Sequence, residues 1–481
     1  MTTSPVRFLR RALLCVTLVA IAHGLFFIWY QRPDWRTQWS DQDGYRRLAE
    51  VLATTGKFTR EPDAQPFVPE VLRTPAYPLF LAAIYKVAGP GQLPVALAQT
   101  ALFAATCLLV FAIARRMAPE SIALAAAAAT ALFSPLPYFG ALVMTELWTT
   151  FVFVVAIWIA IRALQSGRMT SFVALGVMLG VIALSRPIYV LFPFALAMVG
   201  CFVVPFVSRR DVVEPADRRP SFGHWAVMLA AFAVTMLPWF MYNYVNVGRF
   251  TISPAGGIGR ALWEGQWQAT WSGRLQNELT HIAEANEDNS AGVDSLVAGV
   301  AAREHLPAGP MLEYVHQWHD IRQIWTTPVD PRERVTARVR ADGEYLRVGL
   351  DNLRHDSAGH LLKRLARGEF VLWAGEIPIR YSNINDVPPI VVRLIWGVQA
   401  TIVLLALVGL FALFKAGRGA EACLLGSCLL YLSAVLFPLF SEARHSLPVQ
   451  PIVLILATFG VASLTGHSLA LKPQVHERQH L

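Results

Sequence analysis

The residues best suited to chemistry in this sequence are acids and bases that lie beside apolar segments. They are Asp41, Asp43, Arg73, Lys86, Glu146, Arg186, Glu442, Arg444 and His445. A carboxylate can act as a general base, and the arginine fork binds phosphate through paired hydrogen bonds. A charge at membrane depth costs roughly 2.5–3.5 kcal/mol on insertion scales, so it suggests function. None of these residues alone establishes a function, because a long charged side chain near the end of a span can extend to the membrane–water interface.

The elements that must position these residues are membrane spans. The chain has 481 residues, of which 55% are hydrophobic and only 15% charged, with a mean hydropathy of +0.44. Soluble domains carry about 25% charged residues, so this composition excludes a soluble globule, and the hydrophobic content excludes disorder. The five cysteines lie in apolar runs and predict buried side chains rather than a disulfide scaffold. The +8 charge is spread between apolar runs, which does not favour a nucleic-acid partner.

About ten stretches are apolar over roughly the 20 residues that a transmembrane helix needs. They lie at about 11–30, 92–114, 120–140, 145–163, 171–186, 188–207, 224–242, 389–414, 420–439 and 447–466. Lys and Arg are enriched in alternate short loops, which predicts that both termini are cytoplasmic and that the number of spans is even. The first span is interpreted as an uncleaved anchor. Its apolar run continues past the cleavage-like Ala20-Ile21-Ala22 to Trp29, further than a signal peptide needs.

Two long extracytoplasmic loops interrupt the spans. The first, about 31–91, lies in an N-terminal module of residues 1–242. The second, 243–388, precedes the C-terminal spans in 389–466 and a cytoplasmic tail at 467–481. In the first loop, Ser40 to Tyr45 opens an amphipathic helix that ends before Gly56, and Pro75 opens an apolar helix too short to span. The second loop is expected to be mainly helical and laid against the membrane, with two helices in 331–373.

Taken in order, these motifs resemble those of GT-C class glycosyltransferases that use polyprenyl-phosphate sugars. The similarity is to the bacterial family related to protein O-mannosyltransferases and lipid A aminoarabinose transferases, and it covers most of the chain. The residues that carry it are Asp41, Tyr45, Leu48-Ala49, Gly56, Arg73 through Ala82, Glu146, Arg186-Pro187, Pro238-Trp239, Asn243, Glu442, Arg444, His445, Pro448 and Pro451. The resemblance implies an all-α polytopic protein of the inner cell membrane with a GT-C-like fold and an extracytoplasmic active site.

The resemblance also implies a reaction. A hexose or pentose would pass from a polyprenyl-phosphate donor to a hydroxyl of a lipid, glycan or protein acceptor, with inversion and with no required cofactor. Asp41 would be the general base; Asp43 is the second candidate, because Gln42 stands where many relatives have Glu. Donor-phosphate contacts are assigned to Arg73, Lys86, Arg186 and Arg444, and other pocket positions to Tyr45, Tyr77, Glu146, Glu442 and His445.

Several alternatives remain open at this stage. The Asp41-Gln42-Asp43 spacing can hold a divalent metal through carboxylate oxygens. The two aspartates can also simply favour a helix N-terminus, with Asp43 pairing to Arg47. Rival functions are a cell-envelope polysaccharide ligase or polymerase, a lipid-linked sugar transporter, and a non-catalytic scaffold. A transporter would favour repeated halves, and a ligase would centre its chemistry on the late loop; neither pattern is found here.

Overall fold

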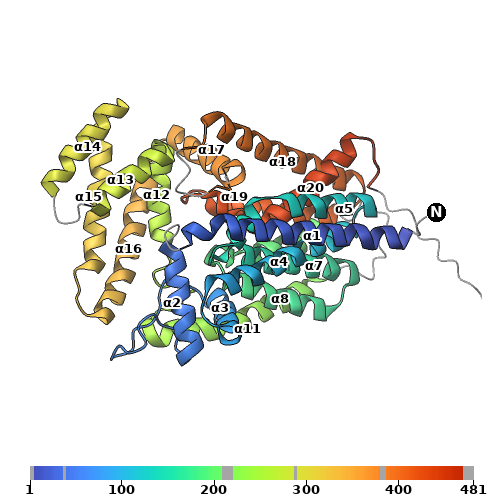
Figure 1. The fold of residues 1–481 in the computed structure, drawn as a ribbon, viewed down its shortest axis with the longest axis horizontal. Helices are drawn as coiled ribbons and strands as arrows, with labels where there is room; N and C mark the ends of the chain where they lie inside the picture. The colour runs from blue at the N-terminus through green and yellow to red at the C-terminus, as the bar shows by residue number, and fades with distance from the viewer. Residues whose placement is uncertain are drawn as a thin grey trace, which may run out of the picture.

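A computed structural model describes residues 5–35, 40–207, 220–285, 290–375, 378–379 and 386–469. Within these ranges the chain forms helices and loops and no β-strand. Figure 1 shows long helices stacked side by side, with a second group of helices, α12–α16, at one end of the stack. The predicted all-α polytopic membrane protein is therefore confirmed.

Eight helical stretches among the described residues are long and apolar enough to cross a membrane. They are Val6–Gln31 in α1 (Pro5–Gln31), α4 (Gln92–Ala114), α7 (Thr145–Ser166), Pro187–Val207, α11 (Phe222–Val247), α18 (Pro389–Lys415), α19 (Gly419–Leu436) and Leu447–Leu464. Pro187–Val207 contains η2 (Pro187–Tyr189), α9 (Phe192–Met198), η3 (Val199–Val203) and α10 (Val204–Val207). Leu447–Leu464 contains η8 (Leu447–Val449) and α20 (Gln450–Leu464).

Two of the ten predicted spans are shorter than expected. The stretch at 120–140 divides into α5 (Glu120–Leu132) and α6 (Pro135–Gly140), and the stretch at 171–186 is α8 (Met169–Ala183). A proline follows the end of both α5 and α8. Proline disfavours helix in the residue before it and is common at the start of the next element, which explains why both helices end early. A count of ten spans therefore stays a prediction.

Small residues let the spanning helices approach closely. The alanine-rich α5 buries Ala123, Ala126 and Ala127 completely. Where α18 crosses α20, a Cβ added to Gly409 or Gly460 would collide with the backbone of the facing helix. Dispersion between closely packed backbones is a main source of helix association in lipid, so these residues hold the bundle together.

The first loop forms the two predicted helices, α2 (Ser40–Thr55) and α3 (Ala76–Ala88), after a short turn, η1 (Arg32–Asp34). The apolar face of α2 packs on α3, with Ala49 in one buried cluster with Tyr77 and Leu81. Gly56 ends α2 with a φ of +72°, a conformation that favours glycine. The N-terminus of α2 is thereby fixed against the spans.

The second loop is helical, as predicted. Its elements are α12 (Ile258–Thr270), α13 (Gly273–Ala285), α14 (Ser290–Glu304), α15 (Ala308–Thr326), α16 (Pro331–His355) and α17 (Ala358–Ala374). That the loop is laid against the membrane face stays a prediction. Helices α12–α16 bury an aromatic core of their own, which includes Trp263, Trp267, Trp271, Tyr314 and Trp318. This core makes them a separate layer beside the bundle (Figure 1).

Candidate active site

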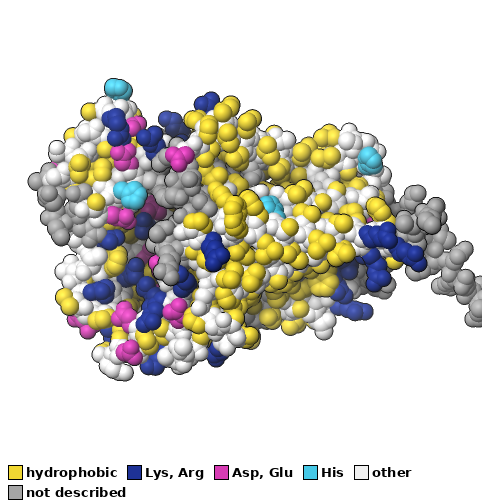
Figure 2. Space-filling view, viewed as in Figure 1, with side chains coloured by type: hydrophobic (Ala, Val, Ile, Leu, Met, Phe, Trp, Pro, Cys, Tyr) yellow, Lys and Arg dark blue, Asp and Glu magenta, His cyan; other side chains and the backbone are white. Residues whose placement is uncertain are grey.

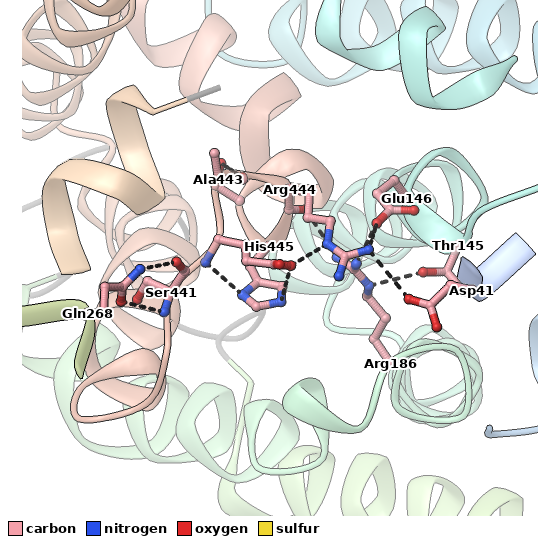
Figure 3. Close-up of polar contacts among 11 residues, drawn as sticks. Asp41, Thr145, Glu146, Arg186, Gln268, Ser441, Ala443, Arg444 and His445 are labelled. Carbon is pink, nitrogen blue, oxygen red and sulfur yellow. Dashed lines mark hydrogen bonds and ion pairs between the residues drawn. The ribbon is translucent and has the colours of Figure 1, made fainter. Parts of the chain in front are cut away.

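A cluster of charged side chains lies near the contact between Gln268 of α12 and Ser441 (Figure 3). Four parts of the chain supply it: the first turn of α2, the segment before α3, the region from α7 to η2, and the connection from α19 to α20. We call Asp41, Arg73, Glu146, Arg186, Glu442, Arg444 and His445 the charged cluster. All seven had been assigned to the site from the sequence, and the structure brings them together.

Asp41 is the accessible carboxylate of the charged cluster. Its Oδ1 lies 3.4 Å from Arg73 Nη2, and its Oδ2 lies 3.8 Å from Arg444 Nη1. The Asp41 side chain is 51% exposed, whereas Arg73 and Arg444 are 10% and 19% exposed. Asp41 is thus held loosely between two guanidinium groups and stays open to a substrate.

Glu146 is the buried carboxylate, with a side chain that is 1% exposed in the first turn of α7. Its Oε1 lies 2.8 Å from Arg186 Nη2 and 3.8 Å from Arg444 Nη1. Arg186 also donates from Nε to Thr145 Oγ1 at 3.1 Å and from Nη1 to the Arg444 carbonyl at 3.1 Å. Arg186 is extended because proline follows it, which turns its side chain out of the α8 axis. Glu146 therefore fixes the position of both arginines.

The connection before α20 forms a tight unit around η7 (Ala443–His445). Glu442 pairs with Arg444 Nε and lies 3.7 Å from His445 Nε2. Burial opposes ionisation of Glu442, but Arg444 and His445 outweigh it and lower its pKa to about 2. Burial lowers the pKa of His445 to about 3, so its ring is neutral near pH 7. Its Nδ1 accepts from the Glu442 backbone N–H at 3.3 Å, which places the ring proton on Nε2, facing the carboxylate.

The two predicted pocket tyrosines pack beside the charged cluster. The Arg73 guanidinium carbon lies 4.9 Å from the centre of the Tyr45 ring, and the Tyr45 and Tyr77 rings meet edge to face at 5.2 Å. Tyr77 donates from its hydroxyl to Gln99 at 3.3 Å. Burial raises the pKa of Tyr45 to about 12, so it stays protonated. These contacts give the tyrosines a packing role against Arg73.

Two assigned residues lie away from the charged cluster. Asp43 is 65% exposed and pairs with Arg46, not with Arg47, so the predicted pairing is wrong. Residues two apart on a helix do not face each other, which separates Asp43 from Asp41. Lys86 lies in the last turn of α3, nine positions beyond Tyr77; that is roughly 13 Å along the axis at 1.5 Å per residue.

The geometry does not fit a metal shared by Asp41 and Asp43. Their carboxylates face different arginines, and Asp41 already has two guanidinium groups beside it. Among the described residues, no three His, Cys, Asp or Glu side chains are grouped so that they could hold a metal ion.

The residue next to Asp41 has a positioning role that the sequence did not reveal. Gln42 is 1% exposed. Its Oε1 accepts from the Val143 backbone N–H at 2.9 Å and from Gln92 Nε2 at 3.2 Å. Gln42 therefore ties the start of α2 to α4 and to the segment before α7. A polar residue at a buried helix position is the signal that could have identified it.

Gly44 is the second residue missed, because glycine in a helix carries no obvious function. A Cβ at this position would occupy the space of the Arg73 guanidinium group. Gly44 thus allows Arg73 to lie against α2 and reach Asp41.

Helices α12 and α17 of the second loop also hold the site. Gln268 of α12 donates to the Ser441 carbonyl at 2.7 Å and accepts from the Ser441 N–H at 2.9 Å (Figure 3). Arg364 of α17 donates to the carbonyls of Pro438 at 2.7 Å and Leu262 at 2.6 Å. These bonds fix the segment that presents Glu442 and Arg444. No local sequence signal could have identified a pair that is 173 residues apart.

Comparison with known proteins gives one family match. Residues 72–239 match the family described as dolichyl-phosphate-mannose-protein mannosyltransferase. This match agrees with the resemblance to protein O-mannosyltransferases over a range that includes Arg73, Glu146 and Arg186. Asp41 and the segment 442–445 lie outside the matched range. No curated protein matches the chain.

Solved structures with a similar arrangement are distant in sequence. One is the archaeal oligosaccharyltransferase AglB from Archaeoglobus fulgidus in complex with an inhibitory peptide and a dolichol-phosphate. It is 12% identical, with a TM-score of 0.49, over 95% of this chain and 50% of that one. Another is ArnT from Cupriavidus metallidurans bound to undecaprenyl phosphate. It is 15% identical, with a TM-score of 0.39, over 93% of this chain and 78% of that one. The present chain thus spans about half the length of the archaeal protein.

Proposed function

We propose that this chain, whose residues 72–239 match the mannosyltransferase family, is a membrane glycosyltransferase. It would move a sugar from a polyprenyl-phosphate donor to a hydroxyl acceptor on the extracytoplasmic face, with both termini in the cytoplasm. The observation that carries this proposal is the position of Asp41, an open carboxylate between Arg73 and Arg444. A base beside phosphate-binding arginines is what this transfer requires.

The chemistry can be assigned to individual atoms. The acceptor hydroxyl gives its proton to the Asp41 carboxylate while its oxygen forms a bond to the anomeric carbon. The bond from that carbon to the phosphate oxygen breaks on the opposite face, which inverts the centre. The phosphate leaves with the electron pair, and Arg73, Arg186 and Arg444 stabilise its charge. Every atom transferred comes from the donor or the acceptor, so the step consumes no further reactant.

The ion pairs of Glu146 and Asp41 differ in length and burial, and this difference supports different roles for the two carboxylates. The ion pair between Glu146 and Arg186 is 2.8 Å long, whereas Asp41 lies 3.4 and 3.8 Å from its arginines. A charge that is held tightly and buried orients its partner, whereas an exposed and loosely held carboxylate is free to accept a proton. We therefore assign positioning roles to Glu146 and Glu442 and the base to Asp41. Asp43 and Lys86 are left with surface roles.

The test uses purified full-length protein in lipid vesicles that contain a polyprenyl-phosphate sugar labelled in the sugar. Because the acceptor is unknown, a membrane extract supplies it, and release of polyprenyl phosphate is measured together with label in the product. The proposal predicts that both appear at the same rate. Donor that crosses the bilayer unconsumed would instead establish the transporter. Transfer only from a preassembled, lipid-linked glycan would establish the ligase.

A further inference from the structure

Two arginines of the extracytoplasmic helices share one aromatic ring. The guanidinium carbon of Arg338, on α16, lies 4.4 Å from the centre of the Trp325 ring, and that of Arg322, on α15, lies 5.3 Å from the same ring. Arg322 also lies 4.7 Å from the ring of Trp318, which is 2% exposed in the aromatic core. We call Arg322, Trp325 and Arg338 the arginine stack.

Arg338 of the arginine stack lies close enough to Arg73 of the charged cluster for the two positive charges to influence each other. Val339, the neighbour of Arg338, is buried against Val71, which is two residues before Arg73. On the same segment, Glu70 pairs with Arg60 at 2.7 Å and approaches Arg73 to 4.0 Å. Figure 2 shows Lys and Arg side chains gathered where the extracytoplasmic helices meet the N-terminal part of the chain. Packing of α16 on the first loop therefore joins the two groups of arginines.

Arg338 has unused hydrogen-bonding capacity. Within the part of the chain that the structure describes, its guanidinium group makes no hydrogen bond and no ion pair. Its N–H donors lie in the plane of the group, so stacking on Trp325 leaves them free at the edge. Burial, together with the positive charges of Arg60, Arg73 and Arg322, lowers the Arg338 pKa to about 10, and Glu70 is the opposing carboxylate. A half-buried cation among like charges is stabilised when an anion binds.

We propose that Arg338, with Arg322 beside it, binds an anionic group of the acceptor, a phosphate or a carboxylate, next to the transfer site. This inference rests on the proposed function, because it needs an acceptor to be brought to Asp41. The donor phosphate is already served by Arg186 and Arg444 on the bundle side, whereas Arg338 belongs to the extracytoplasmic layer. The substrate class is therefore an acceptor that carries a negative charge as well as a hydroxyl. A second phosphate on the donor would bind Arg338 through the same chemistry, and the experiment below distinguishes it from an anionic group of the acceptor.

The experiment measures binding, so it does not depend on turnover. Full-length protein in nanodiscs of zwitterionic lipid is saturated with undecaprenyl phosphate, which fills the donor site. Glucose 1-phosphate is then titrated by calorimetry at low ionic strength, with methyl glucoside as the neutral probe. Arg338→Gln is compared with Arg340→Gln, a matched control at an exposed position of the same helix. Arg338→Lys retains the charge and reports whether the site tolerates substitution.

The expected result is that wild type binds glucose 1-phosphate but not methyl glucoside. Arg338→Gln should weaken binding roughly 10- to 100-fold, the range for a lost hydrogen bond to a charged group. Arg338→Lys should lose less, and Arg340→Gln should bind like wild type. Equal binding by Arg338→Gln, or no binding by wild type with or without undecaprenyl phosphate, would overturn the site. Wild-type binding found only in a parallel titration without undecaprenyl phosphate would assign Arg338 to the donor instead. A failed transfer assay with intact binding would reject the proposed function alone.

Discussion

Replacement of Gly44 by alanine should separate stability from donor binding. Alanine in a helix interior is favoured over glycine by about 0.5–1 kcal/mol. The new Cβ would occupy the space of the Arg73 guanidinium group, which can swing away because it ends a flexible side chain. Arg73 would then leave Asp41 and the Tyr45 ring, contacts worth about 0.5–1 kcal/mol each at exposed sites. The two lost contacts outweigh the gain from alanine by about 0–1.5 kcal/mol, so the melting temperature should fall slightly.

Donor binding should weaken much more. A hydrogen bond to a charged group contributes about 1.5–3 kcal/mol, so loss of the Arg73 contact should weaken phosphate binding roughly 10- to 100-fold. The assay is the affinity of purified protein for undecaprenyl phosphate, which does not depend on the identity of the sugar. The control is Gly299→Ala on α14, where a Cβ meets no atom within 4 Å; it should bind like wild type.

The double mutant Gly44→Ala/Arg73→Gln tests whether Gly44→Ala weakens donor binding by displacing Arg73. If Gly44→Ala acts by displacing Arg73, it should add almost nothing to Arg73→Gln, because the two changes remove the same contact. Wild-type affinity in Gly44→Ala would refute the assignment of Arg73 to the donor phosphate. Additive losses in the double mutant would show that alanine acts elsewhere on α2.

Three further predictions concern the surroundings of the site. Gln268→Ala removes both bonds to Ser441 and should lower kcat roughly 10-fold or more by freeing Arg444; unchanged kcat would contradict the role of α12. The pKa of His445 is lowered from 6.5 to about 3, so the unfolded chain binds its proton first and stability should fall as pH drops from about 6.5 towards 3. His445→Gln should flatten that melting-temperature slope, and an unaltered slope would count against it. Chelation with EDTA should leave the transfer rate unchanged; loss restored by one divalent ion would contradict the metal-free assignment.

The sequence predicted the membrane class and the members of the charged cluster because topology places particular segments at one end of the bundle. Asp41, Arg73 and Arg186 each occupy a position in the motifs that the sequence shares with the family it resembles. The helix start at Ser40 was predicted and is confirmed, whereas the pairing of Asp43 with Arg46 instead of Arg47 was not predicted.

The remaining features depend on contacts between distant parts of the chain. Gln268 and Ser441 are hydrogen-bonded across 173 residues, and α16 packs on the first loop where Val339 and Val71 share a buried cluster. The aromatic core of α12–α16 uses tryptophans that, in one sequence, look equally suited to a membrane surface. Contacts of this kind are set by tertiary packing and leave no periodic pattern in the sequence from which they could be predicted.

The central claim, that Asp41 is the base, is tested most directly by single-turnover transfer with Asp41→Asn and Asp43→Asn. The two residues lie on the same helix turn, but Asp41 is held between Arg73 and Arg444 and Asp43 pairs with Arg46. Asp41→Asn should slow transfer by about 10²- to 10⁴-fold, the range for a general base, with undecaprenyl phosphate still bound. Asp43→Asn should keep the wild-type rate. Equal rates for wild type and Asp41→Asn would contradict the account.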